Sequence, residues 1–460
     1  MQNDFGGQRV LILGAARQGL ALARYLVQHG GRVTLNDRTP ADKMANAMAS
    51  LKDISESVRW VMGSHPVELL NDADLVCVSG GVPLATPIVV EAQARGIPLS
   101  NDSQIFLEVT PCQVIGITGS AGKTTTTSLV GKIAVERVTE SVKLQASRRV
   151  YVGGNIGLPL IARVDEMVPE DIAIMELSSF QLEIMNRSPQ IAAVLNVTPN
   201  HLDRHETMAA YVAAKRRILE YQGVEDVAVL GRDDPGAWGM AGMVMGGLVS
   251  FGFGGLESGV GTYIRGNDVL YAGDDSEVWI MDISSVQLRG EHNMQNVLAA
   301  CAIAAAAGIP PAAMRAGVSG FTGVMHRLEF VRRWGGADWY NDSIATAPER
   351  TIAAIRSFEE PIILLAGGRD KDLPWGDFAA LVSHRVDHLV LFGEAAEKIG
   401  LAMGNYPYTR CANLKEAVQA AVHLVEPGDV VLLSPGGTSF DEFKDFEERG
   451  ECFKQLVMSL

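Results

Sequence analysis

Short apolar runs that end at or beside a glycine recur along the whole chain. The first, 9-RVLILG-14, leads into the helical pattern 19-GLALARYLVQHG-30 and then into a second run, 32-RVTLND-37. A strand, a helix and a second strand in this order predict a βαβ unit with parallel strands. The pattern recurs and closes near residue 111, so we expect a Rossmann-like first module over residues 1–111.

Two further groups of apolar runs predict two more α/β modules. The central group combines strand and helix patterns, at residues 113–120, 171–177, 191–197, 207–221 and 291–308. The third group begins near residue 325 and has apolar runs at residues 361–368, 388–393 and 430–437. Continuous apolar runs are typical of parallel strands buried on both faces. We expect a central parallel sheet over residues 112–323, with hairpins or loops in the Gly-rich stretch 241–259, and a Rossmann-like C-terminal module over residues 324–460.

The composition narrows the class of protein mainly by exclusion. A length of 460 residues, 47% of them hydrophobic and 20% charged, suits several packed domains. The net charge of −15 and the lack of a basic stripe argue against nucleic-acid binding. The most apolar run, 297-VLAACAIAAAAGIPP-311, is short and Ala-rich, which predicts a buried helix and no membrane insertion. No apolar signal segment follows Met1, so we expect a cytoplasmic protein, with a monomer as the working expectation.

The first glycine turn departs from the dinucleotide-binding pattern. In 14-GAARQG-19, Ala16 replaces the second glycine of GxGxxG, and its methyl group obstructs the approach of a pyrophosphate. Asp37, at the end of the next strand, suits a ribose hydroxyl or a nucleobase amide. A tight packing turn and a ligand-binding turn both stay open here, and NAD is disfavoured.

The stretch 116-GITGSAGKTTTT-127 lies between an apolar strand and a helix that we expect to begin near Thr124. Gly119 and Gly122 permit positive φ angles, which turn successive backbone N–H groups into a nest for an anion. Lys123 can bridge the β- and γ-phosphates of a nucleotide, and the Thr124 hydroxyl can bind Mg²⁺. A strand, a GK[ST] motif and a helix together predict a P-loop ATPase-like centre rather than a chance loop with a surface lysine.

Two polar residues follow the neighbouring strands of the central sheet. Glu176 ends one strand, and His201 follows the next one in 194-VLNVTPNHLDRH-205. The carboxyl ends of parallel strands meet at one edge of a sheet, so both side chains are expected beside the phosphate loop. There they are candidate Mg²⁺ ligands, although histidine is an uncommon one. Taken singly, each is more typical of a solvated loop residue.

Later helical segments carry three more candidates. Lys215 lies inside 207-TMAAYVAAKRRILEYQ-222, where residue type alone favours an ordinary helix cation. Asn293 and Asn296 are spaced to share one face of a helix. One of the two suits an adenine contact, and the other suits a helix cap.

These motifs in this order resemble the Mur ligases, the ATP-dependent amino-acid ligases of peptidoglycan synthesis. The stretches that carry the resemblance are TGSAGKTT, GGNIG, ELSSFQLE, LNVTPNHLDRH, YVAAKRRI, GEHNMQN, MHRLEFV and NDSIAT. They run from the central module into the third in family order, and the first module matches more loosely. The segments 367-GGRDKD-372 and 434-SPGGTSFDEFKDFEERG-450 are similar to those of members that add glutamate.

The resemblance implies a ligase that joins D-glutamate to UDP-N-acetylmuramoyl-L-alanine, using ATP and Mg²⁺. ATP would phosphorylate the substrate carboxylate, and the glutamate amine would attack the acyl phosphate and release phosphate. The same ligation with L-glutamate is one alternative. A folylpolyglutamate synthetase-like ligase is another, weakened by the complete first module. A catalytically silent nucleotide-binding partner is a third, and the joint presence of Lys123, Glu176, His201 and Lys215 speaks against it.

The resemblance also implies roles for individual residues. The catalytic residues would be Lys123, His201 and Lys215. ATP would contact Gly119, Ser120, Ala121, Gly122, Lys123, Thr124, Thr125, Asn293, Arg327 and Asp342. The UDP-linked substrate would contact Asp37, Gly81, Asn155, Ser178 and Gln181, and glutamate would contact Thr346, Lys371, Ser439 and Phe446. The metal ligands would be Thr124, Glu176, His201 and Lys215.

Three positions affect how closely the site would match the family: Lys215, Ala16 and Ile344. The family carries a carbamylated lysine where this chain has Lys215, and carbamylation would turn that cation into an anion able to hold a second Mg²⁺. Ala16 alters the first glycine turn, and Ile344 stands where many members have a lysine. The choice between D- and L-glutamate therefore stays open, and the mildly basic stretch 137-RVTESVKLQASRRV-150 predicts no role.

Overall fold

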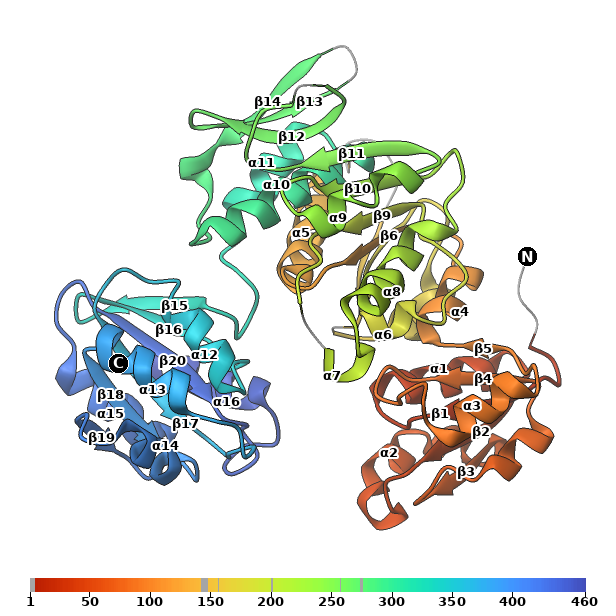
Figure 1. The fold of residues 1–460 in the computed structure, drawn as a ribbon, viewed down its shortest axis with the longest axis horizontal. Helices are drawn as coiled ribbons and strands as arrows, with labels where there is room; N and C mark the ends of the chain where they lie inside the picture. Colours follow the sequence, from red (N-terminus) through yellow and green to blue (C-terminus); the bar gives the residue numbers. More distant parts are fainter. Residues whose placement is uncertain (1–4, 142–147, 156, 200–201, 257, 274–275) are drawn as a thin grey trace. The chain divides into compact units, whose positions relative to one another are not determined.

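The described residues form three β-sheets, one after another along the chain (Figure 1). The computed structural model describes residues 5–141, 148–155, 157–199, 202–256, 258–273 and 276–460. The chain divides into two units. One holds the first two sheets and the other the third, with the second unit made of Leu288–Gly290 and Thr322–Leu460. The predicted class, three consecutive α/β modules, is confirmed.

The first module is a five-stranded parallel sheet in the order β3-β2-β1-β4-β5, the arrangement of a dinucleotide-binding half. Alternate residues of β1 divide between its faces: Val10 and Ile12 pack with α1, while Leu11 and Leu13 pack with α3. The strands are β1 Arg9–Leu13, β2 Arg32–Asp37, β3 Val58–Met62, β4 Leu75–Val78 and β5 Leu99–Ser100. The helices are α1 Arg17–Gln28, α2 Ala45–Ser50, α3 Pro87–Ala94 and α4 Asp102–Val109, with short 3₁₀ turns η1 Ala41–Lys43, η2 Lys52–Ser57 and η3 Val67–Asp72.

The central module is a nine-stranded sheet in the order β14-β13-β12-β11-β10-β9-β6-β8-β7. Its strands are β6 Gln113–Thr118, β7 Val150–Gly154, β8 Ile172–Glu176, β9 Ile191–Val194, β10 Val227–Gly231, β11 Gly247–Phe251, β12 Val260–Arg265, β13 Asp268–Ala272 and β14 Glu277–Asp282. Its helices are α5 Lys123–Ser141, α6 Ser179–Leu182, α7 Leu202–His205, α8 Met208–Glu220, α9 Pro235–Trp238, α10 Glu291–Ala306 and α11 Pro311–Ser319, with 3₁₀ turns η5 Leu160–Glu166, η6 Ala241–Met243 and η7 Ile283–Ser285. The predicted buried helix is α10, and none of the helices in the described residues is long and apolar enough to cross a membrane.

Two expectations for the central sheet are wrong. The stretch 241–259 contains β11, a strand that pairs parallel with β10 and β12, instead of only hairpins or loops. The sheet is also mixed, because β12, β13 and β14 pair antiparallel. Glycines make these strands hard to recognise from the sequence. A Cβ on Gly261 would lie 2.2 Å from the Ser250 carbonyl oxygen of the neighbouring strand. Glycine there allows close backbone approach, although it weakens the sequence signal for a strand.

One hydrophobic cluster joins the first two modules. It runs from α1 and α4 of the first module through η5 to α8 of the central one, and includes Leu26, Phe106, Leu160 and Ile218. Helices α5 and α10 pack against each other and against strands of the central sheet. The shared core explains why the first two modules form a single unit.

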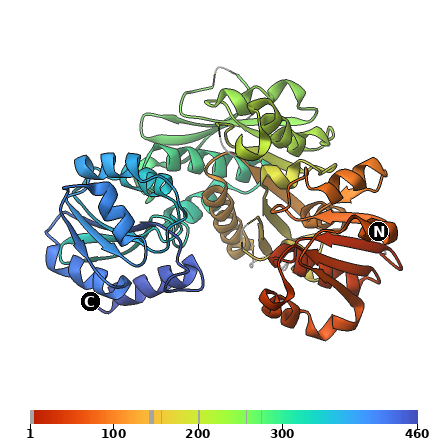
Figure 2. The ribbon, with the colours of Figure 1, turned by 60° about the horizontal axis from the view of Figure 1, so that its bottom comes forward.

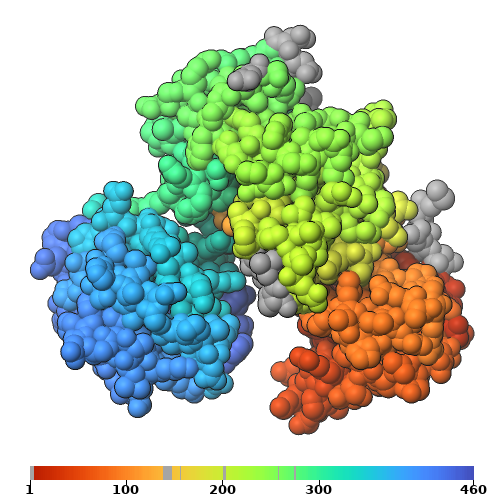
Figure 3. Space-filling model, viewed as in Figure 1, coloured from red at the N-terminus to blue at the C-terminus, as the bar shows by residue number. Residues whose placement is uncertain are grey.

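The C-terminal module is a six-stranded sheet in the order β15-β16-β20-β17-β18-β19, with helices on both faces (Figure 2). Along β17, Leu364 and Ala366 pack with α12, α13 and α14, and Ile363 and Leu365 pack with α15 and α16. The space-filling view shows this module, in blue, as one continuous body (Figure 3). Its strands are β15 Glu329–Trp334, β16 Ala337–Asn341, β17 Ile362–Gly367, β18 His388–Phe392, β19 Tyr408–Arg410 and β20 Val430–Gly436. Its helices are α12 Pro348–Ile355, α13 Gly376–Arg385, α14 Ala396–Met403, α15 Leu414–Leu424 and α16 Phe446–Met458.

Candidate active site

The predicted phosphate loop connects β6 to α5, and the helix begins at Lys123, one residue earlier than expected. Gly122 has a φ of +81°, as a backbone nest requires. The expectation of a positive φ at Gly119 is wrong. A Cβ on Gly119 would lie 2.9 Å from the Leu195 Cβ, so this glycine is needed for close packing against the chain that follows β9.

Asn196, which the sequence interpretation missed, holds the loop in place. Its Oδ1 accepts a hydrogen bond from the Ala121 N–H at 2.8 Å, and its carbonyl accepts one from the Ser120 N–H at 2.9 Å. The Ser120 hydroxyl also lies 3.0 Å from the Tyr211 hydroxyl. The available signal was the position of Asn196 directly behind an apolar strand that neighbours the loop.

A lysine, a hydroxyl and a buried carboxylate meet at the start of α5. The Lys123 Nζ donates to the Gly119 carbonyl at 2.8 Å and thus lies over the loop. The Thr124 hydroxyl donates to the Glu176 Oε2 at 2.9 Å, and the Asn155 amide donates to the Glu176 Oε1 at 2.9 Å. Glu176 is only 2% exposed and has no ion-pair partner within 4 Å among the described residues. A buried carboxylate held only by neutral donors, beside a threonine hydroxyl, fits a hard divalent cation such as Mg²⁺.

Lys215 lies beneath the same loop and is 1% exposed, so it is not the ordinary helix cation that residue type alone favours. Its Nζ donates to the Gly119 carbonyl at 2.8 Å and lies 4.7 Å from the centre of the Tyr211 ring. Burial, aided by the charge of Lys123, lowers the pKa of Lys215 to about 6, and Glu176 opposes this shift. The amine is therefore largely uncharged at neutral pH.

The two asparagines of α10 support the loop from another side. Asn296 donates to the Asn293 Oδ1 at 3.1 Å and accepts from the Thr126 hydroxyl at 3.3 Å. A Cβ on Gly122 would lie 2.3 Å from the Asn296 Oδ1, so the loop and α10 fit closely. Asn296 therefore packs against the loop, and Thr125, the next residue before Thr126, is also buried. The remaining central candidate, His201, lies outside the described residues.

The first glycine turn is tightly packed. Gly14 has a φ of +100°, and a Cβ on Gly19 would lie 2.0 Å from the Gly14 carbonyl oxygen. Asp37 accepts hydrogen bonds from the N–H groups of Ala15 and Thr39, each at 2.8 Å. Burial alone would raise the pKa of Asp37, but these N–H groups outweigh it and lower the pKa. The carboxylate fixes the turn and remains ionised.

The other candidates for the UDP-linked substrate lie where the first two modules meet. Ser178 caps α6 in a reciprocal capping box with Gln181. Gln181, which is 1% exposed, also donates to the Ser103 hydroxyl at 2.8 Å, so it links α6 to α4. The glycine turn holding Gly81 lies nearby, because the Arg204 guanidinium donates to the Gly80 carbonyl at 3.0 Å. Asn155 is exposed and contacts Glu176, as described above.

In the C-terminal module, the glutamate candidates follow three adjacent strands, β16, β20 and β17. The Lys371 Nζ, after β17, donates to the Thr346 hydroxyl, after β16, at 3.4 Å. Ser439 follows β20 and is 2% exposed. Phe446 begins α16, and its carbonyl accepts from the Ser343 hydroxyl at 2.8 Å. The carboxyl ends of parallel strands thus gather these residues at one edge of the sheet.

The loop that carries Arg327 is held in an unusual conformation. Its neighbours His326 and Leu328 have φ angles of +62° and +44°, which non-glycine residues rarely adopt. The Leu328 N–H donates to the Asp342 Oδ1 at 3.2 Å, and the Ser434 hydroxyl donates to the Asp342 Oδ2 at 2.7 Å. Burial raises the pKa of Asp342 to about 7, although these donors and two nearby arginines oppose the shift.

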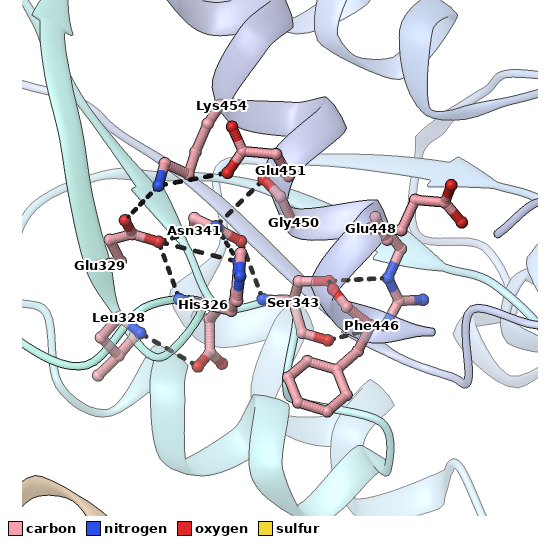
Figure 4. Close-up of polar contacts among 12 residues, drawn as sticks. His326, Leu328, Glu329, Asn341, Ser343, Phe446, Glu448, Gly450, Glu451 and Lys454 are labelled. Atoms are coloured by element: carbon pink, nitrogen blue, oxygen red, sulfur yellow. Dashed lines mark hydrogen bonds and ion pairs between the residues drawn. The ribbon is translucent and has the colours of Figure 1, made fainter. Parts of the chain in front are cut away.

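A buried polar network stabilises this loop from the side of α16 (Figure 4). The Glu329 Oε2 accepts from the His326 backbone N–H at 2.8 Å and from the Asn341 amide at 3.1 Å. The Lys454 Nζ, from α16, lies 2.8 Å from the Glu329 Oε1. The Asn341 amide also lies 3.0 Å from the His326 Nδ1. The network fixes the backbone on one side of Arg327, and the sequence interpretation did not include it.

Substituting Gly450 with alanine tests this network. A Cβ on Gly450 would lie 2.1 Å from the His326 Nδ1, and the ring cannot move freely because His326 is 4% exposed. We expect overpacking to lower the free energy of unfolding of the C-terminal module by about 1–3 kcal/mol, measured by chemical denaturation. Gly376→Ala is the matched control, because its Cβ would meet no atom within 4 Å at the start of α13. Equal stability of the two variants would contradict the proposed fit.

The first unit thus has a phosphate loop, a buried carboxylate beside its threonine and a buried lysine below it, which define a nucleotide-dependent enzyme. Comparison with known families identifies it further. The family descriptions that match are "Mur ligase MurD-like, N-terminal domain" over residues 8–101, "Mur ligase middle domain" over 117–304 and "Mur ligase, glutamate ligase domain" over 326–437. The chain belongs to the Mur ligase family and is an ATP-dependent, amide-bond-forming ligase.

Relatives and solved structures agree with this assignment. A protein of Symbiobacterium thermophilum named UDP-N-acetylmuramoylalanine–D-glutamate ligase is 42% identical over 98% of each chain. A protein of Pelotomaculum thermopropionicum with the same name is 38% identical over 100% of this chain and 99% of its own. The crystal structure of the UDP-N-acetylmuramate-alanine ligase MurC from Thermotoga maritima has a TM-score of 0.57 at 17% identity, covering 98% of this chain and 99% of that one. At that identity the structural likeness supports the fold alone.

Proposed function

We propose that the protein joins D-glutamate to UDP-N-acetylmuramoyl-L-alanine, with ATP converted to ADP and phosphate. The observation that carries this proposal is the cluster of Lys123, Thr124, Glu176 and Lys215 at one phosphate loop. The names of the full-length relatives support the choice of both substrates. We place the reaction in the cytoplasm, where ATP is available. We also propose that the protein acts as a monomer.

The residues of the loop position ATP and balance its charge. Backbone N–H groups from Gly119 to Thr125 hold the phosphates, and Lys123 moves from the loop carbonyls onto the β- and γ-phosphates. We also assign Asn293, Arg327 and Asp342 to ATP. The substrate carboxylate attacks the γ-phosphorus in line, the bond from that phosphorus to the bridging oxygen breaks, and ADP leaves. Charge neutralisation and positioning contribute most of the rate enhancement, because phosphoryl transfer needs little covalent chemistry from the protein.

The amide bond forms in a second step. The glutamate amine attacks the acyl phosphate carbon, the resulting tetrahedral intermediate expels phosphate, and the amine loses a proton. Thr346, Lys371, Ser439 and Phe446 hold glutamate, since a lysine and hydroxyls suit its carboxylates. The UDP-linked substrate is bound by five residues of the first two modules: Asp37, Gly81, Asn155, Ser178 and Gln181. Gln181 and Asp37 would then have two roles, because each also makes the structural contacts described above.

Mg²⁺ would supply charge neutralisation for the transferring phosphoryl group. Thr124, Glu176 and His201 would hold one ion, and carbamylated Lys215 would hold another. Carbamylation forms a bond between the lysine nitrogen and the carbon of CO₂ and releases one proton. It requires an uncharged amine, and the burial of Lys215 favours that form.

The proposed domain boundaries follow the same division of labour. Residues 1–111 would bind the UDP-linked substrate, residues 112–323 ATP, and residues 324–460 the amino acid. The matches to three separate family descriptions support this division.

A phosphate-release assay tests the function directly. Purified protein with ATP, Mg²⁺ and UDP-N-acetylmuramoyl-L-alanine should release phosphate only when D-glutamate is added. L-Glutamate, D-aspartate, L-lysine and diaminopimelate serve as comparison substrates, and tetrahydrofolate with L-glutamate tests the folylpolyglutamate alternative. If the protein turns over neither glutamate enantiomer, the proposed function is wrong. A preference for L-glutamate would correct only the stereochemistry.

A further inference from the structure

Two cations of the C-terminal module approach the same short loop from different elements. Arg350, in the first turn of α12, donates from Nη1 to the Ile344 carbonyl at 3.2 Å. Lys371, in the loop after β17, donates to the Thr346 hydroxyl at 3.4 Å. The loop 344–346 therefore lies between a guanidinium group and an ammonium group. Of the two cations, only Lys371 has so far been assigned to the glutamate site.

Neither cation has an ion-pair partner in the described part of the chain. No carboxylate lies within 4 Å of the Arg350 guanidinium or the Lys371 ammonium there. The two charges affect each other: burial is the larger cause that lowers the pKa of Lys371, and Arg350 lowers it further. The neighbouring carboxylate, Asp342, is 4% exposed and is held by Ser434. The charge of Arg350 acts on Asp342 and opposes the rise in its pKa, but these two residues form no ion pair within 4 Å. Two like charges that lack an ion-pair partner repel, and a bound anion would lower that cost.

We propose that Arg350 is a second carboxylate-binding residue of the acceptor site, so that Arg350 and Lys371 each contact one carboxylate of the amino acid. This inference rests on the proposed function, because it adds a residue to the glutamate site. Among the described residues only the Ile344 carbonyl accepts a hydrogen bond from the Arg350 guanidinium, which leaves the other N–H groups of that side chain for a ligand. A planar guanidinium can bind a carboxylate through two parallel hydrogen bonds.

Two cations explain how the site selects a dicarboxylic amino acid. A monocarboxylic amino acid would neutralise one of them and leave the other facing an uncharged group. Arg350 is exposed and lies on a helix, and its contact with the Ile344 carbonyl restricts its rotamers before the ligand arrives. The discrimination therefore comes from a pair of fixed charges on α12 and on the loop after β17.

The test compares Arg350→Met with Arg356→Met, which changes another exposed arginine at the C-terminal end of the same helix. We expect Arg350→Met to raise the KM for D-glutamate by about 10- to 100-fold, the loss typical of a charged hydrogen bond. The KM values for ATP and the UDP-linked substrate and the midpoint of thermal unfolding should not change. Arg350→Lys should recover part of the affinity, because it restores the charge without the planar fork. Arg356→Met should behave as the wild-type protein.

A second measurement compares glutamate with glutamine, which lacks the side-chain charge. The preference of the wild-type protein for glutamate should shrink in Arg350→Met. An unchanged KM for glutamate in this variant, or an increase in the KM for ATP alone, overturns the assignment of Arg350. The proposed function still stands in that case if the wild-type enzyme is active. If the wild-type protein releases no phosphate with glutamate, the proposed function fails and this inference fails with it.

Discussion

Replacing Lys123 with alanine is expected to lower kcat by at least about 10²-fold, the loss typical when one preorganised charge-stabilising donor is removed. The Lys123 ammonium lies over the loop, on the Gly119 and Ser120 carbonyls, at 2.8 and 3.3 Å. Because it lies at the start of α5, a short rotation of the side chain brings it to a phosphate bound in the loop. In the proposed reaction its charge would act in the transition state, where negative charge develops on the transferred group.

The measurement is steady-state phosphate release with saturating ATP and both other substrates. Lys132→Ala is the matched control, because Lys132 lies on the same helix, is partly exposed and pairs with Glu136 at 3.2 Å. That control should keep wild-type activity, since an exposed pair of this kind contributes little to stability. Thermal unfolding of Lys123→Ala should match that of the wild-type protein. Retained activity of Lys123→Ala would remove the loop from the proposed phosphoryl transfer.

The modules and the phosphate loop were predictable from sequence because both depend on local patterns. Buried parallel strands require continuous apolar runs, as at β6, β17 and β20, and these runs mark the strands in the chain. A phosphate loop requires small residues, a lysine and a hydroxyl in succession. The position of Glu176 beside Thr124 also followed, because a strand end and a neighbouring loop share one sheet edge.

The features that escaped prediction depend on contacts between distant segments. Glu329 and Lys454 approach each other across the C-terminal module, and nothing local in either segment marks the pair. The burial of Lys215 is of this kind: residue type alone favours an ordinary helix cation, only the family resemblance places the residue at the metal site, and the packing of α8 beneath the phosphate loop buries it. Gly119 has a normal φ, and its need for glycine arises from a neighbour, Leu195, on another strand end. Such contacts require the strand order of the sheet, which apolar runs alone do not specify.

Replacing Lys215 is expected to abolish turnover and to allow chemical rescue. We expect Lys215→Ala to lose activity by about 10²-fold or more, because it would remove the carbamate that we propose as a ligand of one metal ion beside the transferring group. A short-chain carboxylate such as acetate or propionate fits the volume that the truncated side chain leaves, and should restore part of the activity as its concentration rises. Lys215→Met, which nearly keeps the side-chain volume, should be inactive and should respond weakly to the same acids.

The environment of Lys215 makes the chemistry of this rescue specific. Its pKa of about 6, caused mainly by burial, leaves the amine uncharged at neutral pH and able to attack CO₂. Wild-type activity should therefore fall after removal of CO₂ and return when bicarbonate is added, and ¹³C-labelled bicarbonate should give a carbamate signal by NMR. Arg216→Ala controls for effects on the helix, because Arg216 is an exposed neighbour on α8. This variant should depend on CO₂ as the wild-type protein does, and short-chain carboxylates should not increase its activity. Full activity of Lys215→Ala would reject the carbamate. The carbamate would also be rejected if Lys215→Ala is folded and inactive, no carboxylate rescues it, and wild-type turnover does not depend on CO₂.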